Sequence, residues 1–143
     1  MKKLLLVAMS ALMLVSFAAC KKSVEPKDMM NEFARIALEN DNDCKVAAEK
    51  LGAYIDANGE AWATWMAGEI KAAAQKGEDY EKLIDKFMTP SDDLKAKLDA
   101  SKCNTDSAMD PVSEKLGKVV MAKVLPVVAE LEAAKAVKED TKE

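Results

Sequence analysis

Apolar residues recur at intervals of three and four along most of the chain after residue 25, and this spacing is the feature that most constrains the fold. Met30, Phe33 and Ala37 form one such row, and similar rows follow further along. No segment alternates apolar and polar residues as a half-buried strand would. At 50% apolar and 32% charged residues, the chain can bury a core beneath a charged surface. The sequence therefore predicts an all-α fold, a compact bundle of five or six helices.

Turn and capping residues divide this pattern into separate helices. Pro26 suits the first position of a helix, and residues 40–43 look like a break that ends in a capping residue. Asn58-Gly59 predicts the end of a second helix, because both residues tolerate a left-handed C-terminal turn. The remaining predicted helices are residues 60–76, a segment from Tyr80 to Thr89-Pro90, a short one carrying Leu94 and Leu98, and a last one from Asp110-Pro111 to about residue 138.

The last predicted helix is long and unusually apolar. Residues 119–129 hold a single charge, Lys123, so we expect this helix to lie in the middle of the bundle. The stretch is too short to span a membrane. Pro126 lacks a backbone donor and clashes with the preceding turn, which predicts a kink. We thus expect a single helical domain over residues 26–138, followed by a frayed, charged tail at 139–143.

The first residues are typical of an export signal. Lys2 and Lys3 precede an apolar stretch at residues 4–17, and small residues follow. The segment 17–20, Phe-Ala-Ala-Cys, resembles the lipobox of bacterial lipoproteins, with Phe17 where that family usually has Leu. The resemblance implies removal of residues 1–19 and attachment of diacylglycerol and palmitate to Cys20, with residues 20–25 as a short tether. The membrane would then be a partner through the acylated Cys20.

Two other outcomes for the N-terminus remain open. Ordinary cleavage after Ala18 would release a soluble protein, and retention of the apolar stretch would leave a membrane anchor. Lys21, where inner-membrane lipoproteins of enteric bacteria have Asp, resembles the sorting pattern of outer-membrane lipoproteins. The resemblance implies a lipid-anchored protein of the bacterial cell envelope, at the outer membrane facing the periplasm or the cell surface rather than at the inner membrane.

Cysteine parity predicts one disulfide. If Cys20 carries lipid, Cys44 and Cys103 remain, and in an oxidising envelope two remaining cysteines most simply pair with each other. The alternatives are two buried free thiols or a redox sensor.

Composition excludes several classes of function. The chain has no histidine, so Ser-His-Asp and Cys-His catalysis and His-ligated zinc or haem are ruled out in their usual forms. Its formal charge of -4 argues against binding the phosphate backbone of nucleic acid. The methionines are scattered and mostly at helical core positions, so we expect no copper site. The acidic segments beginning at Asp41 and Asp56 lack the Gly and Glu of a calcium loop. We interpret both segments as helix boundaries capped by acids and expect no catalytic residue, metal or cofactor.

Trp62, Trp65 and Met66 share one face of a predicted helix. This face is either part of the core or a site for a ligand or partner. The sequence favours a non-catalytic, lipid-anchored envelope protein that acts as a partner-binding or structural helical module, with an envelope protein as a possible partner. The alternative is a protein that binds a small apolar ligand in a gap near Trp62, Trp65 and Pro126.

Overall fold

The computed structural model describes residues 25–140, with side chains as far as residue 137, and these residues form an all-α fold without a strand. The predicted signal peptide, Cys20 and most of the tether lie outside the described residues, as do residues 141–143. The elements are five α-helices and three 3₁₀ turns: η1 (Pro26–Asp28), α1 (Met29–Glu39), α2 (Cys44–Gln75), α3 (Tyr80–Met88), α4 (Asp92–Asp99), η2 (Lys102–Thr105), η3 (Ser107–Met109) and α5 (Asp110–Asp140). The predicted fold class is confirmed.

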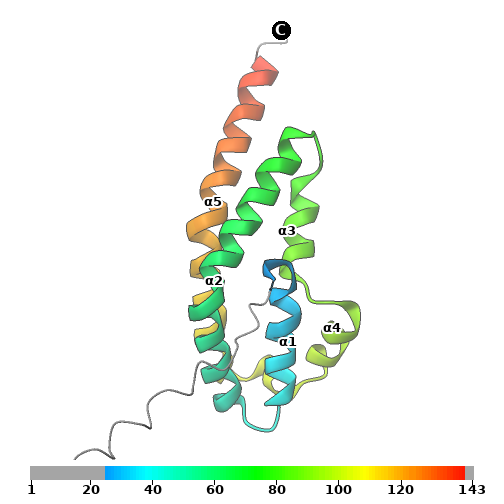
Figure 1. The fold of residues 1–143 in the computed structure, drawn as a ribbon, viewed down its shortest axis with the longest axis vertical. Coiled ribbons are helices and arrows are strands. Elements are labelled where there is room, and N and C mark those ends of the chain that lie inside the picture. The colour runs from blue at the N-terminus through cyan, green and yellow to red at the C-terminus, as the bar shows by residue number, and fades with distance from the viewer. Residues whose placement is uncertain (1–24, 141–143) are drawn as a thin grey trace, which may run out of the picture.

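The two long helices, α2 and α5, run side by side and in the same direction (Figure 1). On the other side of α2, α1 and α3 follow each other along its length, both antiparallel to it, and α4 packs against α1. Two neighbouring helices that run in the same direction need a long connection between them. The chain therefore returns through α3, α4 and the turns η2 and η3 before α5 begins. The far end of α5 extends beyond the end of α2.

α2 is one continuous helix of 32 residues, so the predicted end at Asn58-Gly59 is wrong. Gly59 is buried inside the helix, where a Cβ would lie 3.4 Å from Val119 Cγ1 of α5. This glycine therefore permits close approach of α5 and does not end the helix. Asp56 and Glu60 lie inside the same helix and therefore do not cap a helix end. The helix ends near Gly77, which has a φ of +75° in the left-handed region, as its sequence position predicts.

α2, not α5, occupies the middle of the fold. It packs against α1, α3, α5 and all three 3₁₀ turns, and it contributes most of the core. On α5, Val112 and Val124 are buried, whereas Met121 is 57% exposed and Leu125 is 50% exposed. The expectation that α5 lies centrally is therefore wrong, because only one side of this apolar helix has a neighbour among the described residues.

Pro126 lies inside α5, and the helix continues through it to Asp140. The ring removes one backbone N–H from the helix, but the residues on either side remain helical. The carbonyl that loses this donor belongs to Ala122. Because Ala122 and Pro126 are both exposed, this carbonyl can turn towards water. The helix extends slightly beyond the predicted end at residue 138.

Candidate functional site

The tryptophan face lies mostly in the core. Trp62 is 1% exposed and Met66 is 0% exposed, so both side chains serve packing. Trp65 is half-buried and packs against Phe87 of α3, with ring centroids 4.7 Å apart. Pro126 is exposed on α5 and Trp62 is enclosed, so the structure does not bring the residues of the suggested apolar-ligand gap to one opening.

Trp65 borders a shallow hollow on the outer face of α2. The hollow has a volume of about 840 Å³ and is lined by one helix: Asp56, Ala57, Glu60, Ala61, Thr64, Trp65, Gly68 and Glu69. The small residues create the depression, since Gly68 has no atom within 4 Å of the place where a Cβ would lie. A hollow lined by one helix has no second wall with which to enclose a small ligand.

Two acids beside this hollow pair with lysines from α5. Lys115 Nζ lies 2.6 Å from Asp56 Oδ2, and Lys123 Nζ lies 2.8 Å from Glu60 Oε1. The hydrogen bond from Lys123 lowers the pKa of Glu60. The carboxylates are exposed, so these pairs align α2 with α5 more than they stabilise the fold.

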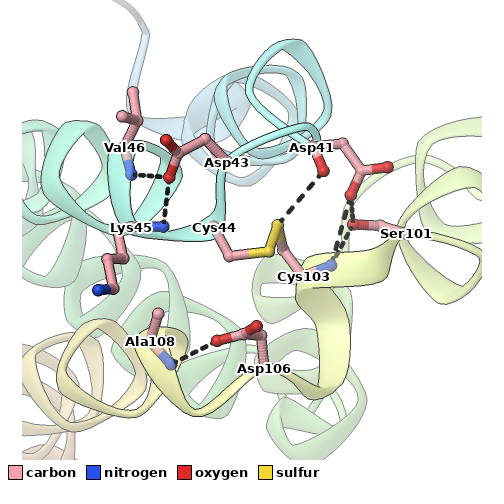
Figure 2. Close-up of a disulfide and its surroundings, with 9 residues drawn as sticks. All are labelled: Asp41, Asp43, Cys44, Lys45, Val46, Ser101, Cys103, Asp106 and Ala108. Carbon is pink, nitrogen blue, oxygen red and sulfur yellow. Dashed lines mark hydrogen bonds between the residues drawn. A yellow bond between two sulfur atoms is a disulfide. The ribbon is translucent and has the colours of Figure 1, made fainter.

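The disulfide predicted from cysteine parity joins Cys44, at the start of α2, to Cys103 in η2 (Figure 2). Asp43 caps α2 from the preceding turn, accepting hydrogen bonds from the backbone N–H groups of Lys45 and Val46. Capping fixes where α2 begins, and the disulfide then attaches that point to the segment leading into α5.

Asp41 adds a polar contact at the same corner (Figure 2). Its carboxylate accepts hydrogen bonds from the Ser101 hydroxyl and, at 3.4 Å, from the Cys103 backbone N–H. The Ser101 hydrogen bond is the main cause that lowers the pKa of Asp41. An ionised Asp41 that accepts these hydrogen bonds holds two loops together.

A second polar contact lies at the opposite end of α2, where Tyr80 of α3 is buried. Lys135 Nζ of α5 donates to Tyr80 Oη at 3.2 Å and lies 4.4 Å from the ring centroid. The hydrogen bond raises the pKa of Lys135. These contacts, beside a hollow of about 360 Å³, fasten α3 to the distal half of α5.

Large apolar side chains are exposed on the side of α5 that faces away from α2, which we call the α5 outer face. Six residues define it, all exposed and spaced by one, three or four positions along the helix: Lys118, Met121, Ala122, Leu125, Ala129 and Glu132. Met121 and Leu125 leave large apolar side chains about half in water. An exposed apolar row between charged ends is typical of an interaction surface.

The sequence contains a signal for this face, but that signal fits two different arrangements of the helix. A stretch with one charge in residues 119–129 indicates a helix with apolar residues on more than one side. A helix buried on all sides within its own domain and a helix with one side covered by a partner have the same apolar pattern. Sequence periodicity alone does not distinguish these two arrangements.

Among residues 25–137, whose side chains the structure describes, no three or more acidic or cysteine side chains are grouped so that they could hold a metal ion. Within the same residues, no helix combines the length and apolar character needed to cross a bilayer. Comparison of the chain with protein-family models, curated proteins and solved structures gives no significant match.

Proposed function

We propose that this protein is a non-catalytic, lipid-anchored module of the bacterial cell envelope that binds a protein partner through the α5 outer face. The lipobox-like sequence ending at Cys20 supports the anchor. The observation that carries the binding role is the exposure of Met121 and Leu125, at 57% and 50%, on a helix whose other side is packed. Leaving two large apolar side chains in water forgoes stabilisation that a partner could supply.

Two measurements on the full-length chain in an exporting bacterium test the two halves of this proposal. For the anchor, the wild-type chain should incorporate radioactive palmitate, whereas Cys20→Ser should incorporate none and should accumulate as precursor or as soluble product. Equal labelling of the two chains would reject lipidation of Cys20.

For the binding role, formaldehyde treatment of the envelopes should yield a cross-linked adduct of the wild-type chain. Leu125→Glu places a charge in the centre of the α5 outer face and should abolish that adduct. Ser113→Glu is the matched control, because Ser113 is an exposed residue in the first turn of the same helix, where an acid is tolerated. An adduct that survives Leu125→Glu unchanged would reject the α5 outer face as the site.

A further inference from the structure

The residues of the α5 outer face are complementary to those of a second copy in an antiparallel arrangement. Consider a second α5 laid antiparallel on the first, with the two-fold axis passing at Leu125. Residues at equal distances on either side of Leu125 then face each other in the two copies. Lys118 is seven residues before Leu125 and Glu132 is seven after it, so each lysine meets a glutamate of the other copy.

The sizes of the apolar residues match in the same arrangement. Met121 lies four residues before Leu125 and Ala129 four after it, so a large side chain meets a small one at two places. The two Leu125 side chains meet at the axis. A parallel pair would instead place Lys118 against Lys118 and Glu132 against Glu132, which like-charge repulsion disfavours.

The charged ends are available for this pairing. Lys118 and Glu132 are both exposed. Within one copy, Lys118 Nζ lies 2.5 Å from Glu114 Oε1 one turn away, a pair exposed to solvent and therefore weak. Exchanging this pair for one between Lys118 and Glu132 of a second copy therefore costs little free energy.

We propose that the α5 outer face binds a second copy of this chain, forming a symmetric antiparallel dimer centred on Leu125. This inference rests on the proposed function, since it names the occupant of the same face. The contact from residue 118 to residue 132 extends about 21 Å along each helix. A contact of one helix pair is modest, and confinement of both copies to one membrane surface through Cys20 would raise their effective concentration.

The test is site-directed cross-linking of the full-length chain in intact cells of an exporting bacterium. Leu125→Cys puts two thiols at the two-fold axis, so non-reducing electrophoresis should show a species of twice the mass. Mass spectrometry should identify it as the position-125 peptide joined to its own copy. Ser113→Cys is the control: its two thiols would lie about 36 Å apart in this dimer and should not cross-link.

Charge reversal tests the register. In the Leu125→Cys background, Lys118→Glu alone and Glu132→Lys alone should each lower the cross-linked fraction about fivefold, since each replaces two attractive pairs by two repulsive ones. The two reversals together should restore it. If Leu125→Cys accumulates poorly, the double variant Met121→Cys/Ala129→Cys serves instead, because these positions face each other between copies.

Several outcomes overturn the inference. Absence of the homodimer in both cysteine variants, or equal cross-linking from Ser113→Cys, would reject the dimer. Failure of the double reversal to restore cross-linking would reject the register. A position-125 adduct to a different protein would reject the second copy while leaving a partner-binding face in place. Membrane fractionation of the same cells separates the two proposals, because a homodimer found only in the soluble fraction would reject the anchored function and retain the dimer.

Discussion

At the scale of single residues, the hydroxyl of Tyr54 is a buried group whose oxygen has no hydrogen-bond partner among the described residues. Burial is the main cause that raises the pKa of Tyr54 to about 12, and the carboxylates of Glu32 and Asp28 add to it. The surroundings therefore favour the neutral phenol. Nothing in them stabilises a phenolate, so we assign the residue a packing role between α1 and α2.

Tyr54→Phe should leave the free energy of unfolding at neutral pH unchanged or increase it by up to about 1 kcal/mol, because it removes a buried hydroxyl without a partner. The wild-type chain should also lose stability that the variant keeps as the pH rises from 10.0 towards about 12. The sign follows from the raised pKa: the folded state retains the phenol proton that the unfolded chain has already released. Urea unfolding of both chains across this range measures the difference.

Comparison of the two chains cancels the titration of lysines in the same pH range. A variant less stable than the wild type by more than about 1 kcal/mol at neutral pH would show that the hydroxyl has a partner.

Asp41 has the opposite pH dependence. The pKa of Asp41 is lowered from 3.8, chiefly by the Ser101 hydrogen bond. The contribution of Asp41 to the free energy of unfolding is therefore present above pH 3.8 and is lost as the pH falls below that value. Asp41→Asn should destabilise the fold at neutral pH and reduce its sensitivity to acid. Unfolding monitored by circular dichroism at neutral and acidic pH measures both effects.

Asp92→Asn is a suitable control for Asp41→Asn, because Asp92 is an exposed acid in the first turn of α4. Equal acid sensitivity of the wild type and Asp41→Asn would mean that the Ser101 contact does not form in solution.

At the scale of secondary-structure elements, most helices and their ends could be predicted from local sequence. The break before Asp43, the stop at Gly77 and the end of α3 before Pro90 all depend on residues within one turn of the boundary. Gly59 could not be interpreted in the same way. Its role depends on Val119, which is 60 residues away, and a glycine at a helix contact looks like a glycine at a helix end.

Two glycines of α2 allow a direct test of this distinction. Gly68→Ala should stabilise the fold by up to about 1 kcal/mol, because alanine favours helix and no atom lies within 4 Å of the new Cβ. Gly59→Ala gains the same propensity but places its Cβ 3.1 Å from Ile55 Cγ2 and 3.4 Å from Val119 Cγ1, so it should destabilise the fold. Thermal unfolding of the two variants measures the difference in sign.

If Gly59→Ala were as stabilising as Gly68→Ala, the α2–α5 contact would have to be looser than described. If neither changed the melting temperature, α2 would not be helical throughout its middle.

At the scale of the whole molecule, the sequence predicts an all-α bundle with one disulfide but not which helix is central. Both α2 and α5 have long apolar stretches, and helix periodicity contains no information on how many neighbours a helix has. The arrangement depends instead on contacts between distant residues. Cys44–Cys103 fixes one end of the α2–α5 pair, and Tyr80–Lys135 fastens α3 to α5 at the other.

We expect the disulfide to contribute a large share of the stability of this arrangement. Cys44 and Cys103 are 59 residues apart in sequence, and the chain-entropy model gives about 4 kcal/mol for closing a loop of that size. The loop contains α2, α3 and α4, so opening it frees the start of α5 from the start of α2. Total stabilities of small domains are about 5 to 15 kcal/mol, so the loss should be severe.

The double variant Cys44→Ala/Cys103→Ala, in the soluble form lacking residues 1–20, should therefore lose about 4 kcal/mol in urea unfolding and melt at a much lower temperature. Alanine is chosen because Cys103 is 1% exposed and serine would bury a hydroxyl there. Reductant should destabilise the wild type to a similar extent and leave the double variant unchanged, which serves as the control. Two free thiols in protein taken from the envelope under non-reducing, denaturing conditions would reject the bridge, and the parallel register of α2 and α5 would then depend on side-chain packing alone.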